Sequence, residues 1–238
     1  MNRNRLRWLT ARPIAHRGYH DIRRGRPENT LAAFDAAVEG RYAIECDLHI
    51  SADSVPVVFH DDNLQRLTED TGPVRDRTAA ELGDLRIAGT GEWIPTFDEL
   101  LSLVAGRVPL VLELKHIPRR DAGLAFEVVK RLADYAGPAA LMSFEPGLIA
   151  EVKAADPNLP RGLTALGSWR HGPLYFRTVF ELGVDFASYS IDDLPTPAPV
   201  LVRRLFGIPL ICWTVRTKAQ LQKAKRWTDQ VTFEGFAA

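Results

Sequence analysis

The chain is poor in cysteine, has no long apolar run and has no excess of either charge sign. Its two cysteines, Cys46 and Cys212, cannot form a disulfide framework, and both lie in apolar stretches, which indicates buried free thiols in a reducing compartment. No run approaches the roughly 18 apolar residues of a membrane-spanning helix. Residues 1–13 are basic but lack the apolar stretch of a secretory signal. These absences predict a cytoplasmic protein.

The charges of the chain cancel, because 30 Lys and Arg residues face 30 Asp and Glu residues. Overall charge therefore gives no reason to expect attraction to nucleic acid or to a membrane. We expect neither a nucleic-acid partner nor stable membrane association, so any recognition of an anion has to be local. The basic residues 1–12 could touch lipid headgroups, but we interpret them as a frayed tail without a function.

From residue 97 onward, short apolar stretches alternate with amphipathic helical stretches, which is typical of a parallel sheet with crossover helices. The expected helices are 97–104, 122–135, 146–155, 173–182, 199–206 and 218–227. The expected strands are 109–114, 140–143, 161–163, 185–187, 209–214 and 230–233. So many repeats in 238 residues favour closure into a TIM-type (β/α)8 barrel, a fold of about 250 residues.

The early part of the chain adds three more strand candidates, at Ile14-Ala15, 42–50 and 55–59, and a helix capped by Asn29 or Thr30. Nine candidates for eight barrel positions leave one over, and we expect it to be 55–59. Residues 61–92 are polar and too few to bury a core of their own. We therefore predict a single catalytic domain over residues 1–238, with 61–92 as a small cap.

Two histidines and a pair of carboxylates lie close together in the early sequence. His16 and His60 each follow an apolar run, a position suited to proton transfer. Glu45 and Asp47 fall on the same face of their strand, about 7 Å apart along it. Acidic side chains on an inward face repel each other without a cation, so this pair predicts a metal site.

Glu113 supplies a third carboxylate at the end of a later strand, two residues before Lys115. Barrel enzymes carry their chemistry at the C-terminal ends of the strands, which is where these side chains fall. Three carboxylates without a neighbouring thiol suit a hard cation, Mg²⁺ or Ca²⁺. The alternative is a solvated strand end with an ion pair between Glu113 and Lys115.

These residues form an ordered series of motifs. The series is His16-Arg17-Gly18, Pro27-Glu28-Asn29-Thr30, Glu45-x-Asp47, His60-Asp61-x-x-Leu64-x-Arg66-x-Thr68, Ile94-Pro95-Thr96-Phe97-x-Glu99-Leu100-Leu101, Glu113-Leu114-Lys115 and Trp213-Thr214-Val215. In order and spacing it resembles the glycerophosphodiester phosphodiesterase family, which belongs to the phosphatidylinositol phospholipase C-like barrels. The resemblance implies a metal-dependent hydrolase that converts glycerophosphodiesters to glycerol 3-phosphate and an alcohol.

The resemblance also implies roles for individual residues. His16 and His60 would act as acid and base, in an order that the sequence does not assign, and attack by the neighbouring glycerol hydroxyl would give a cyclic phosphate that water then opens. Arg17 and Lys115, with the metal, would neutralise the phosphate. Trp213 is either a core aromatic or a platform for the glycerol carbons or head group. Glu28 would orient Arg17 or a histidine.

Other residues are expected to lie outside the chemistry or to modify it. His49 is interpreted as structural or as part of the rim, and His20, His116 and His171 as facing solvent. Arg216 stands where many relatives have Asn, and the chain end at 228–236 departs from the usual family pattern. These departures concern head-group preference, and Arg216 could favour a second anionic group.

Two other functions suit the same residues. One is a lipid phosphodiesterase of the lysophospholipase D or sphingomyelinase D type, which would need an exposed apolar rim that the polar segment 61–92 does not provide. The other is a barrel that binds phosphorylated ligands without catalysis, which the intact histidine pair argues against.

Overall fold

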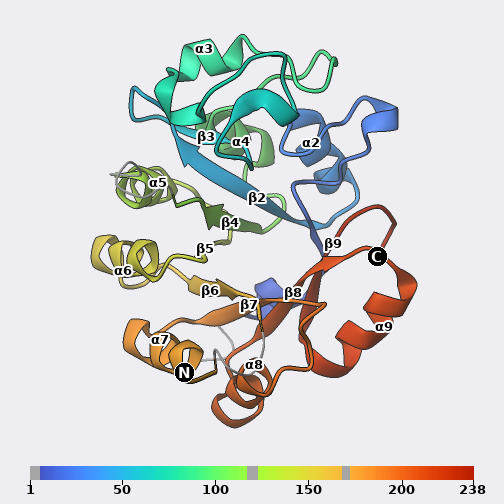
Figure 1. Cartoon of the computed structure of the whole chain (residues 1–238), viewed down its shortest axis with the longest axis vertical. Helices are drawn as coiled ribbons and strands as arrows, with labels where there is room; N and C mark the ends of the chain where they lie inside the picture. The colour runs from blue at the N-terminus through green and yellow to red at the C-terminus, as the bar shows by residue number, and fades with distance from the viewer. Residues whose placement is uncertain (1–5, 117–122, 168–171) are drawn as a thin grey trace.

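The computed structural model describes residues 6–116, 123–167 and 172–238, and its centre is a closed parallel barrel (Figure 1). Eight parallel strands follow one another in the order β1-β9-β8-β7-β6-β5-β4-β2, and β1 pairs with β2 to close the ring. In that last pairing Ile14 lies opposite Ala43. The predicted TIM-type (β/α)8 fold is confirmed.

The strands are short and the helices lie outside them. The strands are β1 (Ile14–Ala15), β2 (Ala43–Ile50), β3 (Pro56–Val58), β4 (Leu110–Leu114), β5 (Ala139–Ser143), β6 (Arg161–Ala165), β7 (Phe186–Ser190), β8 (Leu210–Val215) and β9 (Gln230–Phe233). The helices are α1 (Arg7–Thr10), α2 (Leu31–Glu39), α3 (Ala79–Gly83), α4 (Phe97–Val104), α5 (Leu124–Leu132), α6 (Pro146–Ala155), α7 (Gly172–Leu182), α8 (Pro197–Leu201) and α9 (Lys218–Trp227). Four short helical turns complete the described elements: η2 (Ile22–Arg24), η3 (Leu64–Arg66), η4 (Val74–Asp76) and η6 (Val202–Phe206).

The surplus strand is β3, as expected. It pairs antiparallel with β2, with Val57 opposite His49, and so lies outside the parallel ring. Two of the later helices differ from the expectation by two residues or more at an end. The helix predicted at 122–135 spans only Leu124–Leu132, and the one predicted at 199–206 begins at Pro197 and continues as the π-helical turn η6.

Side chains along the barrel strands alternate between the interior and the helices, because successive strand residues point to opposite faces. The lower interior, near the strand starts, is apolar and is closed from below by the segment that contains α1. Its buried members are Leu6, Leu9, Ile14, Ala43, Val111, Ala140, Met142, Phe186 and Ile211. The larger apolar core lies between the strands and the helices.

The segment between β3 and α4 folds over one side of the barrel top (Figure 1). It buries a small apolar cluster that includes Leu64, Val74 and Leu82, but the cluster is completed by Val57 and Phe59 from β3 and its end. The segment therefore depends on the barrel edge for its packing.

Within residues 6–116, 123–167 and 172–238, none of the helices combines the length and the apolar character needed to cross a bilayer.

Candidate active site

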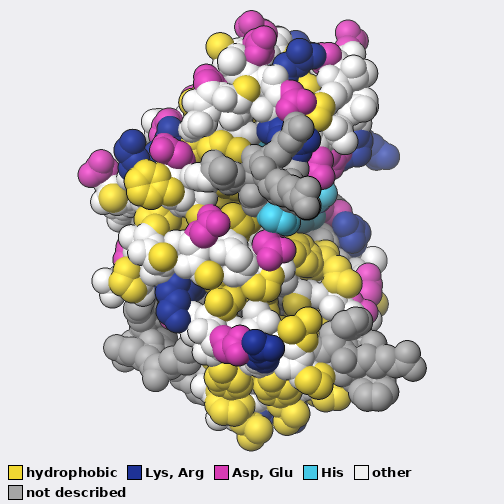
Figure 2. Space-filling view, turned by 60° about the vertical axis from the view of Figure 1, so that its left-hand side comes forward, with side chains coloured by type: hydrophobic (Ala, Val, Ile, Leu, Met, Phe, Trp, Pro, Cys, Tyr) yellow, Lys and Arg dark blue, Asp and Glu magenta, His cyan; other side chains and the backbone are white. Residues whose placement is uncertain are grey.

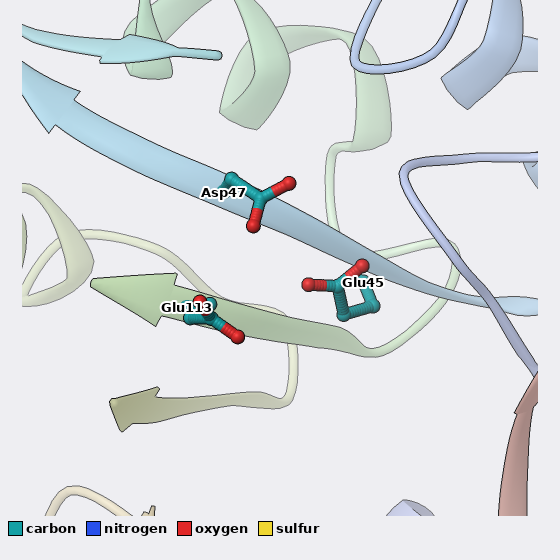
Figure 3. Close-up of side chains that lie close together, drawn as sticks. All are labelled: Glu45, Asp47 and Glu113. Atoms are coloured by element: carbon teal, nitrogen blue, oxygen red, sulfur yellow. The ribbon is translucent and has the colours of Figure 1, made fainter. Parts of the chain in front are cut away.

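Three carboxylates converge in the upper barrel interior (Figure 3). Glu45 and Asp47 project from β2, and Glu113 projects from β4, where it is the register partner of Asp47. One oxygen from each lies within 4.8 Å of the others, and all three residues are buried. Side chains two residues apart on a strand point the same way, and β2 and β4 are neighbours, so the three acidic groups lie together.

Burial and mutual repulsion dominate the electrostatics of this trio. Burial, followed by the charges of Asp47 and Glu113, raises the pKa of Glu45 well above its ordinary value. Burial also raises the pKa of Glu113. Burial acts the same way on Asp47, but Lys115 and Arg17 outweigh it and hold the pKa of Asp47 well below its usual range. The trio carries more negative charge than the two cations offset, so a divalent cation with oxygen ligands fits it.

Lys115 and Asn29 fix the orientation of the carboxylates. The Nζ of Lys115 lies 2.7 Å from Oε1 of Glu113 and 3.1 Å from Oδ1 of Asp47. The side-chain amide of Asn29 donates to Oδ2 of Asp47 at 2.9 Å. Despite burial, the two carboxylates raise the pKa of Lys115, which therefore stays positively charged.

His16 follows β1 directly and is oriented by Glu234, which follows β9. Its Nδ1 lies 2.6 Å from Oε2 of Glu234, and its Nε2 lies 3.9 Å from Oε2 of Glu45. The Nε of Arg216 donates to the other oxygen of Glu234. Burial lowers the pKa of His16, partly against the hydrogen bond to Glu234. The neutral imidazole therefore directs Nε2 toward the acidic trio.

His60 lies just after β3 and has a similar carboxylate partner. Its Nδ1 is 2.6 Å from Oδ1 of Asp61, and Arg66 from η3 donates to both oxygens of Asp61. Burial lowers the pKa of His60. About a third of its side chain is exposed, against 9% for His16, so His60 has freer access to solvent.

The loop after β1 has a constrained backbone that places Arg17. Arg17 has a positive φ of 55°, which is uncommon for a residue with a side chain. Its backbone N–H donates to Oε2 of Glu45 at 3.0 Å, and its Nε lies 3.4 Å from Oδ2 of Asp47. The next residue, Gly18, has φ +80°, and a Cβ there would lie 2.9 Å from the backbone of Ala33. Only glycine fits at this position.

Glu28 connects the two sides of the site. It accepts from Nη1 of Arg17 at 2.6 Å and from Nη2 of Arg66 at 2.7 Å. Since Arg66 also holds Asp61, Glu28 acts directly on Arg17 and indirectly on His60. Of the two partners left open by the sequence, Glu28 contacts Arg17 directly and contacts neither histidine.

A cavity of about 130 Å³ opens above the trio. Its walls include both histidines, Arg17, Lys115 and the carboxylates, and one side is formed by Trp213 and Phe144. These two rings meet edge to face, with centroids 5.5 Å apart. The indole N–H of Trp213 is buried and has no hydrogen-bond partner among the described residues. The structure therefore brings every predicted catalytic, metal and substrate residue to one cavity, with Glu28 behind Arg17.

Comparison with known proteins gives a family for this arrangement. The family model for the glycerophosphoryl diester phosphodiesterase family matches residues 16–235. The chain belongs to this family. Membership places it among the phosphoric diester hydrolases.

Relatives match over most of their length. A glycerophosphodiester phosphodiesterase of Caldanaerobacter subterraneus is 34% identical over 227 residues, covering 88% of each chain. A solved glycerophosphodiester phosphodiesterase of Thermotoga maritima is 26% identical, with a TM-score of 0.74 and 92% of each chain covered. A phosphodiesterase of Oleispira antarctica, solved with sn-glycerol-3-phosphate, is similar in fold, with a TM-score of 0.81, 24% identity, and coverage of 95% of this chain and 94% of its own.

Several site residues of this family member were not singled out from the sequence. Asn29, Asp61 and Arg66 lie inside the quoted motifs, and that position was the signal that could have identified them. Glu234 had no comparable signal, because it lies in the atypical chain end. Phe144 follows β5 and so lies at the catalytic end of the barrel, but no motif marks it.

The other histidines divide into three kinds. The expectation that His20 faces solvent is wrong: its side chain is only 24% exposed, and its Nε2 lies 3.7 Å from Glu234. His49 is buried, with Nε2 3.2 Å from the carbonyl oxygen of His60, in agreement with a structural role. His116 is exposed, as expected, and His171 lies outside the described residues. Cys46 and Cys212 are buried free thiols, also as expected.

Proposed function

We propose that this chain hydrolyses water-soluble glycerophosphodiesters to glycerol 3-phosphate and an alcohol, as one catalytic domain with residues 61–92 as its cap. The observation that carries the proposal is the pairing of two histidines, each bound at Nδ1 by a carboxylate, with a buried acidic trio in the same cavity. Proton donors, proton acceptors and a cation site in one cavity are what cleavage of a phosphodiester requires. The free buried cysteines support a cytoplasmic location.

Glu45, Asp47 and Glu113 hold the cation. Their ligands are all carboxylate oxygens, which suit Mg²⁺ or Ca²⁺ rather than a softer metal. When bound, the ion withdraws negative charge from the phosphate. Without it, the trio is left with the repulsion that raises the pKa of Glu45.

His16 acts as the base and His60 as the acid. His16 is the more buried of the two, and Glu234 fixes its Nδ1 so that Nε2 is free to accept a proton from the attacking glycerol hydroxyl. Burial lowers the pKa of His60 as well, but Asp61 stabilises its protonated form and its exposure lets it take up a proton from solvent before it protonates the leaving oxygen. Water then opens the cyclic phosphate with the two roles exchanged.

Arg17 and Lys115 bind the phosphate oxygens, since both guanidinium and ammonium groups already lie at the edge of the trio. Trp213 provides an apolar platform for the glycerol carbons or the head group. Its indole N–H, for which the described residues offer no acceptor, is available to a substrate oxygen. Glu28 keeps Arg17 in position.

A second candidate is a lysophospholipase D-like activity, because an apolar rim exists after all. Phe144 is 43% exposed beside Trp213, and Leu166, which follows β6, is exposed at the same end of the barrel. An acyl chain could lie against such side chains. The rim comes from the strand ends and not from residues 61–92.

A product assay separates these activities. The enzyme is given glycerophosphocholine, glycerophosphoethanolamine, glycerophosphoglycerol and a lysophosphatidylcholine, each with and without a chelator. We expect release of glycerol 3-phosphate from the soluble diesters only with metal present. Lysophosphatidic acid as the dominant product would establish the second candidate instead, and turnover that survives chelation would contradict the metal site.

The cation site has its own test in Glu45→Gln. Loss of one of three carboxylate ligands should weaken Mg²⁺ or Ca²⁺ binding by at least about tenfold in a calorimetric titration. A binding isotherm like that of the wild type for both ions would exclude the trio as the site.

A further inference from the structure

Large apolar side chains are exposed on α7 and η6, away from the catalytic cavity. Figure 2 shows hydrophobic side chains gathered over the lowest part of the molecule, where Figure 1 places α7 and α8. Phe180, near the end of α7, is 48% exposed, and Leu205 and Phe206, at the end of η6, are 69% and 49% exposed. The rings of Phe180 and Phe206 meet with centroids 4.7 Å apart. Such a protruding cluster is uncommon on a soluble monomer and marks a contact surface.

The cluster lies at the opposite end of the barrel from the active site. Helices between parallel strands run back from the strand ends to the strand starts, so α7 and η6 finish where β7 and β8 begin. A hollow beside η6 confirms the position, because it is lined by Arg203, Arg204 and Pro209 together with Leu6 and Arg7 from below the barrel.

The surroundings of the cluster are cationic, although the whole chain has no net charge. Residues 194–228 contain seven basic residues and no acidic one. The seven are Arg203, Arg204, Arg216, Lys218, Lys223, Lys225 and Arg226. Two of them are paired with carboxylates. Arg216 binds Glu234 at the active site, and Arg203 pairs with Asp229 at 2.8 Å.

Of the other five, Lys218 begins α9 and Lys223 donates to the carbonyl oxygen of Ile191. The remaining three, near the ends of η6 and α9, have no carboxylate partner among the described residues. Arg204 stacks over Trp227, with its guanidinium carbon 5.6 Å from the ring centre. Lys225 and Arg226 precede Trp227 in the last turn of α9, and both are exposed. We call this surface the docking corner, and its members are Phe180, Arg204, Leu205, Phe206, Lys225 and Arg226.

We propose that the docking corner binds the surface of an anionic phospholipid bilayer. Its protruding Leu and Phe side chains can enter the interfacial region while its cations meet the headgroup phosphates, the combination that holds peripheral proteins on membranes. Each Lys or Arg near an anionic surface strengthens binding about fivefold, and apolar insertion adds to this. The expectation of no stable membrane association, which rested on total charge, does not take account of this uneven distribution.

A second copy of the chain fits the docking corner less well. A two-fold symmetric contact places the same patch of both subunits together. Arg204, Lys225 and Arg226 would then face their own copies, and two carboxylates of this region, Asp229 and Glu181, are already paired with Arg203 and Arg177. Anionic lipid attracts these positive charges, whereas a second copy of the chain would repel them.

Binding by this end turns the catalytic cavity away from the bilayer. The enzyme would be held near a membrane while its active site draws soluble diesters from solution. The inference is independent of the proposed function, because membrane binding is measured without turnover.

A pair of matched variants tests the proposal by vesicle co-sedimentation. Phe206→Ser/Lys225→Gln removes one exposed phenylalanine and one lysine from the docking corner. Phe126→Ser/Lys130→Gln removes the same two side-chain types from α5, where Phe126 is 61% exposed, and serves as the control. Vesicles are either pure phosphatidylcholine or an equimolar mixture with phosphatidylglycerol.

We expect the wild type and the control to bind the anionic vesicles and to be released by high salt, with little binding to pure phosphatidylcholine. The docking-corner variant should bind roughly twentyfold more weakly. Hydrolysis of soluble glycerophosphocholine should be the same for all three proteins. Absence of binding by the wild type, or equal losses in both variants, would overturn the proposal. So would a wild-type dimer that the docking-corner variant makes monomeric, because the surface would then join two copies.

Discussion

The two halves of the barrel interior are built by the same strands and have opposite character. On β2, Ala43 belongs to the buried apolar layer, and Glu45, two residues later on the same face, belongs to the acidic trio. On β4, Val111 and Glu113 repeat this pairing. Two residues along each strand therefore separate the apolar layer, which stabilises the fold, from the acidic layer, which we propose as the cation site.

The difference shows where stability and reactivity come from in this molecule. A fully buried apolar side chain contributes about 1.5–3 kcal/mol to stability. A buried carboxylate opposes folding unless charges or hydrogen bonds compensate it, and the raised pKa of Glu45 shows that compensation is incomplete. The buried apolar layer therefore compensates the unfavourable free energy of burying the acidic trio.

Phe186→Ala should give the largest effect on the apolar side of this comparison. The ring is fully buried and fills the space above Gly162, where a Cβ would come within 2.4 Å of it. Truncation should lower the free energy of unfolding by about 3–5 kcal/mol, measured by urea denaturation. The kcat per folded molecule should be unchanged. A large loss of kcat in a variant that is still fully folded would show that the two layers are not separable.

His60→Ala should show the reverse pattern. Loss of the proposed acid should reduce kcat about 100-fold or more, while the free energy of unfolding changes little because part of the side chain is already exposed. Combining it with His16→Ala should cost much less than the product of the single losses, since paired catalytic groups act as a unit. A near-normal kcat in His60→Ala would require a different proton donor.

Glu234→Gln should produce the smallest change, visible as a pH dependence of stability. Burial would raise the pKa of Glu234, but the hydrogen bonds with His16 and Arg216 outweigh it and hold that pKa well below its ordinary value near 4.5. A lowered folded-state pKa stabilises the protein above the ordinary pKa, and this stability is lost as pH falls below it.

The wild type should therefore exceed Glu234→Gln in stability near neutral pH, and the difference should shrink below about pH 4.5. Thermal denaturation at a series of pH values measures this. Glu181→Gln, which removes a carboxylate from the surface pair with Arg177, is the control for the loss of one negative charge. A difference that grows toward low pH would contradict the argument.

The sequence was sufficient for features that rest on local periodicity or on a motif. Strand and helix alternation predicted the barrel, and motif order predicted that His16, Glu45 and Glu113 would meet. Glu234 escaped prediction because it contacts a histidine 218 positions away, and only barrel closure brings β9 beside β1. The docking corner was not predicted, because the net charge of the whole chain is zero although residues 194–228 contain only basic charges.

Arg66 has a consequence for exchanging caps between related enzymes. It comes from η3 in the segment after β3, yet it holds both Glu28 from the first barrel loop and Asp61 next to His60. A transplanted cap that lacks an arginine at this place would remove the guanidinium that joins Glu28 to Asp61, leaving Glu28 paired with Arg17 alone and Asp61 with His60 alone. Grafts should therefore carry Asp61 and Arg66 as an inseparable unit, with the recipient retaining Glu28.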